Sequence, residues 1–449
     1  MSGRVRTAVV WSAIDGTPRK MGTLVLDAAY MTLNYESDYR ETGLPGLSLL
    51  DDIAAEGQGY YRYPVTEQMP LLPRLRALVP GNNPRNLQRA HYLDVLRRRG
   101  TRLPPGIETE WALLLMGGHG GVGHVDVFRD DREAMAWYAA PNTPQGHTGQ
   151  TLGHSGLWQF LRSQVLDEVD GPDVPVWDDV LGPTPSVGGM IPKLLVAMAP
   201  EGAGGALYPP GTPGKTDVLL KVEPPEYPGL LALESLCLEV HRTAGIEVPN
   251  WWTFENDGLR FLAITRFDRP KIVPVESLFS VIATGNHEVQ SMGDVMLEDL
   301  GGILRILMQT VDLAPDTPQA LYQRFLMAYL TGNGDLHMEN LSLVGSMNGC
   351  RLAPVYDPAP MRAWPRHDLV SAIPFDGAEY ASQADVFVKL GHNLGLSNTQ
   401  VHRAIERALD AVQTYPERVS DCLGVPAKQR QRLVMLSQNA ANKLRQAIQ

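Results

Sequence analysis

Five residues of this 449-residue chain have the types and the order that phosphoryl transfer needs: Lys221, Glu234, Asp335, Asn340 and Asp357. The reaction needs a cation on the phosphates, a metal ion that neutralises charge, and a carboxylate that orients the attacking hydroxyl. A protein-kinase-like site supplies these groups in a fixed chain order: a strand lysine, a helix glutamate, a D-x-x-x-x-N loop and a metal-binding aspartate. The five residues follow that order.

The elements around the first two residues match this scheme. Asp217 to Val222 is a short apolar run that contains Lys221 and ends at two prolines, so it predicts a strand. Leu230 to Ala244 has helical length and pattern and carries Glu234. Leu259 to Phe267 predicts another strand. The result is strand–helix–strand.

The elements around the other three residues match it as well. Thr317-Pro318 is a cap followed by a first-turn proline, so it opens a predicted helix, which Gly332 ends. The loop with the aspartate and asparagine follows. Two strands come next, Leu341 to Val344 and Arg351 to Tyr356, and the second delivers Asp357.

Each of these residues also has a simpler interpretation when taken alone. Asp335 could be a turn or cap residue, Lys221 a surface lysine at a strand end, and Glu234 a solvated helix position. Asp357 precedes a proline and could initiate a turn. His337 is a poor magnesium ligand, because magnesium prefers oxygen, so we expect it either to face the transferred phosphoryl group or to be a packed or capping histidine. The shared order favours the kinase-like interpretation.

Two glycine-rich segments resemble nucleotide-binding motifs but lack their context. Gly118 to Gly123 matches G-x-G-x-x-G, yet it follows a helix-like run and precedes a strand-like one, the reverse of a dinucleotide site. Gly211 to Thr216 resembles a Walker A loop, but Pro209 stands at the first glycine position and a strand follows. The first is predicted to be a glycine-rich turn, and neither is expected to be a nucleotide-binding motif.

The distribution of predicted strands, helices and connections divides the chain into three parts and predicts an α+β fold. Residues 1–183 mix short strands and helices and end in exposed connections rich in proline and glycine. Residues 184–270 hold the strand–helix–strand unit and are the predicted nucleotide-binding lobe. Residues 271–449 are mainly helical and form the predicted catalytic lobe. We therefore expect a bilobal protein-kinase-like fold with an additional N-terminal α+β domain and a helical C-terminal lobe.

Composition limits the class of protein. A net charge of −11 argues against a strong nucleic-acid binder, and the basic run Arg97 to Arg99 is expected to be a solvated helix face. No apolar run approaches the roughly 20 residues of a membrane span, and the first residues lack a signal-peptide core. Three widely separated cysteines, Cys237, Cys350 and Cys422, suit reduced thiols. We expect a cytoplasmic protein.

At this point the chain resembles the HipA family of bacterial serine/threonine kinase toxins. The resemblance covers about residues 20 to 360, is strong from residue 184 onward, and is looser from Gly22 to Leu49. It is carried by these segments: Ser186-Val187-Gly188-Gly189-Met190-Ile191-Pro192-Lys193, Tyr227 to Leu230, Ala244 to Pro249, Arg266-Phe267-Asp268-Arg269, Gly334-Asp335 with His337 and Asn340, and Leu352-Ala353-Pro354 with Tyr356-Asp357.

The resemblance implies a role for each matching residue. Asp335 would be the catalytic base, with His337 near the phosphoryl group. The remaining roles would be as follows: Asn340 and Asp357 hold Mg²⁺, Lys221 contacts the ATP phosphates and is aligned by Glu234, Lys193 with Gly188 and Gly189 covers the phosphates, the hinge from Thr265 to Phe267 touches adenine, and Ser186 is autophosphorylated.

The resemblance also implies substrates and partners. It points to an ATP- and magnesium-dependent toxin that phosphorylates a protein of the translation machinery, such as an aminoacyl-tRNA synthetase. Its partner would be a HipB-like antitoxin with a helix-turn-helix domain, which would supply the only contact with DNA. No membrane partner is expected.

Three features depart from the family. Thr265 stands where the family commonly has glutamate, Glu339 stands where it has lysine, and the last eighty residues match only as generic helices. Two other functions stay open from the residues alone. One is a small-molecule phosphotransferase of the aminoglycoside type, which shares the Asp/Asn/Asp arrangement. The other is an inactive kinase fold that serves as a binding partner.

Overall fold

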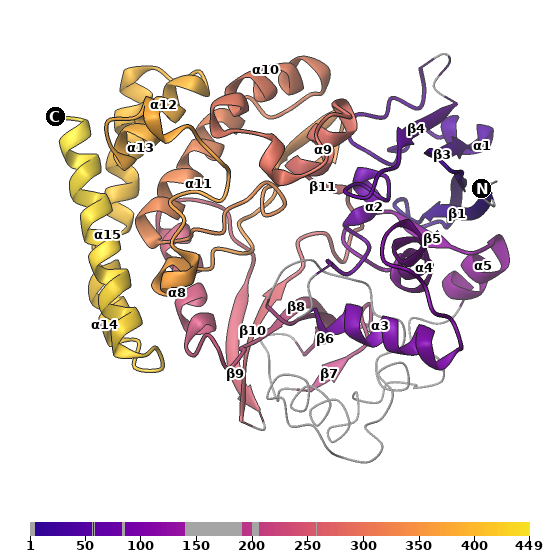
Figure 1. Cartoon of the computed structure of the whole chain (residues 1–449), viewed down its shortest axis with the longest axis horizontal. Helices are drawn as coiled ribbons and strands as arrows, with labels where there is room; N and C mark the ends of the chain where they lie inside the picture. The colour runs from indigo at the N-terminus through magenta and orange to yellow at the C-terminus, as the bar shows by residue number, and fades with distance from the viewer. Residues whose placement is uncertain are drawn as a thin grey trace. The chain divides into compact units, whose positions relative to one another are not determined.

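The structure is a computed structural model that describes residues 5–55, 57, 59–82, 86–139, 191–199, 206–256 and 258–449. The chain divides into two compact units: Met1–Pro225 with Phe254–Glu276 and Ala283–Gln290, and Glu226–Thr253 with Ser277–Ile282 and Ser291–Gln449. The first unit is built mainly on β-sheets, and the second unit consists mainly of helices (Figure 1). The α+β class is therefore confirmed, while the three-part division at residues 183 and 270 remains a prediction.

The first unit begins with an antiparallel sheet of order β4-β3-β2-β1-β5. Along β2, Leu24 and Leu26 are buried while Thr23 and Val25 are less so, because successive side chains of a strand point to opposite faces. The strands are β1 (Arg6–Ser12), β2 (Arg19–Leu26), β3 (Tyr30–Tyr35), β4 (Tyr60–Pro64) and β5 (Asp126–Phe128). The helices of this part are α1 (Ser37–Arg40), α2 (Pro73–Arg76), α3 (Leu87–Arg98), α4 (Ile107–Gly117) and α5 (Asp131–Ala139).

A second sheet, of order β7-β6-β8-β10-β9, contains both strands predicted around Lys221 and Thr265. Its strands are β6 (Lys193–Met198), β7 (Leu207–Tyr208), β8 (Thr216–Val222), β9 (Trp251–Asn256) and β10 (Leu259–Thr265). The strand predicted to reach Phe267 ends at Thr265, because the chain turns from Phe267 onward. The glycine-rich turn predicted at residues 118–123 is confirmed, since these residues join α4 to β5, and a strand, β8, follows residues 211–215 as expected.

The second unit is built around α11 (Thr317–Thr331), whose residues are almost all buried. Pro318 lies in its first turn, where a missing N–H costs nothing. The other helices are α8 (Leu230–Thr243), α9 (Leu278–Gly285), α10 (Leu300–Thr310), α12 (Gln383–Asn393), α13 (Asn398–Ala411), α14 (Tyr415–Asp421) and α15 (Ala427–Ala447). The 3₁₀ helices are η2 (Met292–Asp294), η3 (Leu297–Asp299), η4 (Met361–Ala363), η5 (Pro365–His367) and η6 (Gly377–Glu379), and the strands are β12 (Ser342–Ser346) and β13 (Gly349–Leu352). Strand β11 (Val275–Ser277) and helix α9 each have residues in both units.

The C-terminal helix α15 packs against α11, α12 and α14 (Figure 1, yellow). Its Leu433 is fully buried and lies against Gly332, the residue at which α11 ends. Gly332 has a left-handed backbone (φ +77°), and a Cβ added there would lie 2.5 Å from Leu433 Cδ1. Glycine is therefore required twice at this position, by its backbone conformation and by the packing of α15.

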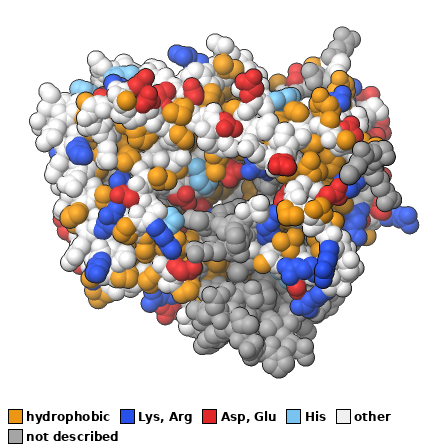
Figure 2. Space-filling model, viewed as in Figure 1, with side chains coloured by type: hydrophobic (Ala, Val, Ile, Leu, Met, Phe, Trp, Pro, Cys, Tyr) orange, Lys and Arg blue, Asp and Glu red, His pale blue; other side chains and the backbone are white. Residues whose placement is uncertain are grey.

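The surface features predicted from composition are also visible. Arg97 to Arg99 are exposed at the end of α3, and Arg98 pairs with Asp94 one turn earlier (2.7 Å). Figure 2 shows basic side chains gathered where Figure 1 places α3, as expected of a solvated helix face. The three cysteines are free thiols. Within the described ranges, no helix has both the length and the apolar character that crossing a membrane requires.

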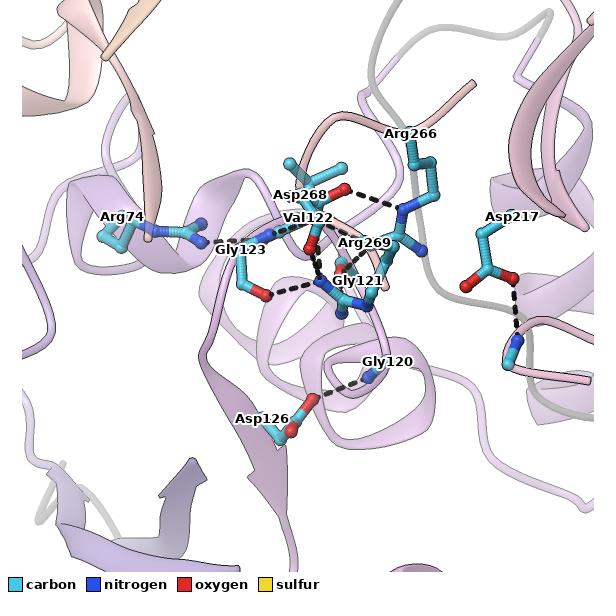
Figure 3. A network of polar contacts seen from close by, with 11 residues as sticks. Arg74, Gly120, Gly121, Val122, Gly123, Asp126, Asp217, Arg266, Asp268 and Arg269 are labelled. Atoms are coloured by element: carbon cyan, nitrogen blue, oxygen red, sulfur yellow. Dashed lines mark hydrogen bonds and ion pairs between the residues drawn. The ribbon is translucent and has the colours of Figure 1, made fainter. Parts of the chain in front are cut away.

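A buried polar network in the first unit ties the end of β10 to the glycine-rich turn before β5 (Figure 3). Arg266 donates to both carboxylate oxygens of Asp268 (2.9 and 2.8 Å) and to the Gly121 carbonyl (2.8 Å). Asp268 also accepts from the Gly123 N–H (2.9 Å) and from Arg269 (2.9 Å). The turn thus serves as a source of backbone hydrogen bonds for buried charges, which explains its glycines without a nucleotide.

The side chains of this pair are almost fully buried, at 4% exposed for Arg266 and 3% for Asp268. Burial alone would raise the pKa of Asp268, but the guanidiniums of Arg266 and Arg269 outweigh it and hold the pKa below its ordinary value. A lowered pKa in the folded state means that the stabilisation is present at neutral pH. It is lost only as the pH falls through that lowered value.

We predict that Asp268→Asn lowers the free energy of unfolding by about 3–5 kcal/mol at neutral pH, because it leaves buried guanidiniums without their counter-charge. Urea denaturation measures this. The control is Glu247→Gln, which removes the carboxylate of an ion pair with Arg351 whose side chains are 56% and 52% exposed. It should cost less than about 1 kcal/mol. Equal losses in the two variants would contradict a structural role for the buried pair.

We also predict that Gly332→Ala destabilises the protein more than Gly395→Ala does. Gly395 has a left-handed backbone too (φ +86°), but a Cβ there would meet nothing within 4 Å. The shared backbone strain should cost about 1–2 kcal/mol in each variant. The clash with Leu433 should add about 1–3 kcal/mol at position 332 alone. Equal unfolding free energies for the two variants would show that α15 does not pack tightly against this turn.

Candidate active site

The predicted catalytic loop is held in shape by its own hydrogen bonds. The Asn333 side chain accepts from the Asp335 N–H (3.0 Å), and the His337 N–H donates to the Asp335 carbonyl (2.8 Å). The same carbonyl accepts from Asn340 Nδ2 (3.0 Å). Asn340 therefore crosses the loop and ties its end to Asp335, and its other amide atom, Oδ1, is the one able to bind a cation.

Apolar and polar residues alternate along this loop. Leu336 and Met338 are buried, at 9% and 0% exposed, while Asp335, His337 and Glu339 are half-buried. The buried pair anchors the loop in the core, which leaves the polar side chains nearer to solvent. The Glu339 N–H donates to His337 Nδ1 (3.2 Å), so this nitrogen is unprotonated and the ring can offer Nε2–H to a ligand.

The hairpin β12–β13 leads from the loop to Asp357. Leu343 pairs with Leu352 and Val344 with Arg351. The predicted second strand is wrong in its length: β13 ends at Leu352, because Pro354 has no N–H to continue the ladder. Beyond the proline, the Val355 N–H donates instead to the Glu247 carbonyl (2.9 Å).

Two side chains, one half-buried and one buried, fix the segment that carries Asp357. The Tyr356 hydroxyl donates to the Glu339 carbonyl (2.9 Å) and lies 3.0 Å from Ser342 Oγ, which links this segment to the catalytic loop. Burial raises the pKa of Tyr356 to about 12, so the hydroxyl stays protonated. Arg324 of α11 donates to the Ala353 carbonyl, and burial lowers its pKa to about 10, which leaves it charged at neutral pH.

Asn340 and Asp357 line the same small pocket, together with Asn333, Arg324 and His241. Burial lowers the pKa of His241 to about 4, so this histidine is neutral. The part of the chain that the structure describes contains no cluster of three or more His, Cys, Asp or Glu placed to hold a metal. Phosphotransferases need no such cluster, since they hold Mg²⁺ with few protein oxygens plus phosphates and water. An amide oxygen and a carboxylate fit that mode.

In the first unit, the two predicted phosphate-binding lysines are neighbours. Lys193 of β6 is the direct cross-strand partner of Lys221 of β8. Directly opposed residues project from the same face of a sheet. Lys221 is fully buried. The surface-lysine interpretation of Lys221 is therefore wrong.

The remaining predicted site residues are distributed as follows. Thr265 ends β10 and Phe267 begins the turn after it, both half-buried and next to the buried Arg266–Asp268 pair. Glu234 lies in α8 of the second unit and is fully buried, so its interpretation as a solvated helix position is wrong. Ser186, Gly188 and Gly189 lie outside the described residues.

Sequence reasoning missed the residues that hold this site in place, namely Asn333, Tyr356 and Arg324. Asn333 directly precedes Gly334-Asp335, and asparagine readily bonds to a backbone N–H two residues on, so this signal was present. Tyr356 stands beside Asp357, but nothing in the sequence says where its hydroxyl points. Arg324 looks like any polar residue of a helix until α11 is known to be buried.

Comparison with known proteins identifies relatives of this chain. The sequence model of the HipA-like C-terminal domain matches residues 185–415, just over half of the chain. The chain is 24% identical over 217 residues to a Haemophilus influenzae protein named "Putative kinase", covering 41% of this chain and 61% of that protein. It is 26% identical over 189 residues to "Putative kinase Y4dM" of Sinorhizobium fredii, covering 39% and 42%. The matches thus span less than two thirds of either relative.

A solved structure shares the fold over nearly the whole length. It is a chain of the HipA–HipB–operator DNA complex from a toxin–antitoxin system of Shewanella oneidensis MR-1, with 98% of this chain and 99% of that chain covered, a TM-score of 0.63 and 18% identity. The predicted kinase-like α+β fold is confirmed by this likeness. With the family model matched over half of its length, the chain belongs to the HipA-like C-terminal domain family.

Proposed function

We propose that this protein is a kinase that transfers the γ-phosphate of ATP to a serine or threonine hydroxyl of a protein, with Mg²⁺ as its cofactor. The observation that carries the proposal is the catalytic loop. Asp335 and Asn340 are tied together across it, and Asn340 shares a pocket with Asp357. Family membership and relatives named as kinases support the same activity.

In this proposal each residue has one task. Asp335 orients the acceptor hydroxyl and takes its proton as the hydroxyl oxygen bonds to the γ-phosphorus and the bond to the ADP oxygen breaks. Lys193 and Lys221 bind the phosphates, and Glu234 aligns Lys221. Asn340 and Asp357 would hold Mg²⁺, which neutralises phosphate charge. Gly188 and Gly189 would cover the phosphates, and Thr265 to Phe267 would contact adenine.

Two residues beside the loop would tune the reaction. His337 can donate from Nε2 to the transferred phosphoryl group, because its Nδ1 already accepts from the Glu339 N–H. Glu339 adds a negative charge where the family commonly has lysine, so we expect it to favour acceptors with nearby positive charge. Thr265, in place of glutamate, would alter nucleotide affinity more than the chemical step.

We further propose that the protein is the toxin of a toxin–antitoxin pair. The Shewanella structure that shares its fold contains HipB and operator DNA, which supports a HipB-like helix-turn-helix partner for this chain. The net charge of −11 favours contact with DNA through that partner. The substrate would be a component of translation such as an aminoacyl-tRNA synthetase, which requires a cytoplasmic location. Ser186 would be its own phosphorylation site.

We predict that Asp335→Asn lowers the rate of phosphoryl transfer about 10²–10⁴-fold, because a positioned base contributes that much. The assay follows label from γ-labelled ATP into the proteins of a bacterial lysate, with phosphosites, Ser186 included, mapped by mass spectrometry. Asp316→Asn, an exposed carboxylate at the other end of α11, is the control and should keep the wild-type rate.

Three outcomes would contradict this proposal. Wild-type transfer by Asp335→Asn would remove the assigned base. Label in small molecules such as aminoglycosides, with none in protein, would indicate a small-molecule phosphotransferase. Magnesium-dependent ATP binding without any transfer would indicate an inactive kinase fold.

We also predict that Asp357→Ala weakens ATP binding about tenfold or more when Mg²⁺ is present, and much less in its absence, because the lost carboxylate acts through the metal. Calorimetric titration of ATP with and without Mg²⁺ measures both constants. Asp335→Asn serves as the matched control, since it should bind MgATP almost as the wild type does. An equal loss in both conditions would mean that Asp357 only shapes the turn before Pro358.

A further inference from the structure

The segment that follows Asp357 is held firmly against the catalytic loop. The Arg362 N–H, in η4, donates to the carbonyl of Gly332, where α11 ends (3.1 Å). Gly334 lies so close that a Cβ on it would come within 2.6 Å of the Leu369 carbonyl and 2.9 Å of Arg362 Cγ. Residues 361–369, which we name the docked segment, therefore pack directly on the residue before Asp335.

One carboxylate stands at the centre of the charges that hold the docked segment. Asp368 Oδ1 accepts from Arg362 Nε (3.0 Å), and Asp368 Oδ2 pairs with Arg432 of α15 (2.6 Å). Arg432 also donates to the Arg362 carbonyl (2.9 Å). Burial would raise the pKa of Asp368, but the two guanidiniums outweigh it and lower the pKa, so the carboxylate is ionised at neutral pH.

Further contacts hold the same segment from the side of α8. The hydroxyl of Tyr227, just before α8, lies 2.6 Å from His367 Nε2. Trp364 meets the Tyr227 ring edge-on, with centroids 5.3 Å apart, and the Arg366 guanidinium lies 4.5 Å from the centroid of that ring. Both ends of the segment are thus attached to the helical unit.

The docked segment comes shortly after Asp357, the predicted metal-binding aspartate, and this position indicates what its contacts could do. In regulated protein kinases, the stretch after the metal-binding aspartate becomes ordered when a phosphate is added to it and pairs with arginines. Here the docked segment contains no serine, threonine or tyrosine, and the first hydroxyl after Asp357 is that of Ser371, just beyond the segment, so the segment itself has no group that could accept a phosphate. A pair of arginines is nevertheless present, and a carboxylate lies between them.

We propose that Asp368 does permanently what an added phosphate does in regulated kinases. It is a positioning residue that draws Arg362 and Arg432 together and keeps the docked segment against the catalytic loop. The site is therefore assembled without phosphorylation of this segment. Helix α15 contributes to this assembly because it carries Arg432. The proposal rests on the proposed kinase function for its catalytic consequence, while the docking itself stands apart from activity.

A competing interpretation is that these ion pairs contribute little to stability, because two of their side chains are partly exposed. The Asp368 and Arg432 side chains are 42% and 28% exposed, and exposed ion pairs often contribute little. Arg362, however, is only 5% exposed, and its backbone is bonded on both sides, to Gly332 and to Arg432. The Asp368 carboxylate should therefore contribute more to stability than a carboxylate that pairs with an exposed arginine on a helix surface.

The test is hydrogen–deuterium exchange of the full-length protein as wild type, Asp368→Asn, Asp368→Glu and Asp94→Asn. Asp94, in the first unit, is the matched control. Its side chain is 41% exposed and pairs with a single arginine, Arg98 of the same helix. We expect Asp368→Asn to speed exchange in residues 361–369 and 332–336 at least about fivefold, since local opening sets exchange rates. Asp368→Glu should restore part of the protection, and Asp94→Asn should match the wild type.

Phosphoryl transfer is measured on the same proteins. We expect Asp368→Asn to lower kcat about tenfold with the KM for ATP changed less than about twofold, because the loop and not the nucleotide loses its support. Arg432→Gln should do the same, and the double variant should be no worse than either single one. Exchange and kcat at wild-type values in Asp368→Asn would overturn the proposal. If the wild type transfers no phosphate, the kinase function fails, and the exchange rates alone still decide whether Asp368 docks the segment.

Discussion

The hydrogen bond from Asn340 Nδ2 to the Asp335 carbonyl is the constraint on which the proposed site depends. This bond crosses the connection of residues 333–340 and fixes the proposed base relative to a proposed metal ligand. With this bond, a single side chain closes the loop, and the same residue lines the pocket that Asp357 also lines. Leu336 and Met338 also anchor the loop, because their side chains are buried in the core.

The supports of this loop come from distant parts of the chain. Gly332 ends α11 where Leu433 of α15 leaves room only for glycine, and the docked segment covers Gly334. Tyr356 ties the catalytic loop to the strand end before Asp357. The C-terminal helices, which resemble nothing specific in sequence, therefore contribute to the geometry of the site.

The sequence predicted much of this arrangement. The helix that opens at Thr317-Pro318, the hairpin after the loop and the strand with Lys221 were all predictable, because caps, turns and apolar runs are local signals. The roles of Asp335, Asn340 and Asp357 remain predictions, but the structure brings Asn340 together with each of the other two.

Other features could not be predicted because they depend on packing between segments far apart in sequence. The end of β13 is an exception: it was placed too late although Pro354, which ends the ladder, is a local signal in the sequence. The Arg266–Asp268 network and the Asp368 cluster join residues up to 148 positions apart, as between Gly121 and Arg269. The cross-strand pairing of Lys193 with Lys221 requires the register of two strands, which no local pattern encodes.

The central claim is that Asn340 and Asp357 hold a metal ion on the phosphates of a nucleotide beside Asp335. A crystal structure of the protein with Mg²⁺ and a non-hydrolysable ATP analogue tests it most directly. We expect a cation about 2.0–2.1 Å from Asn340 Oδ1 and from a carboxylate oxygen of Asp357, shared with the nucleotide phosphates. A metal–nucleotide complex bound without contact to either residue would contradict it.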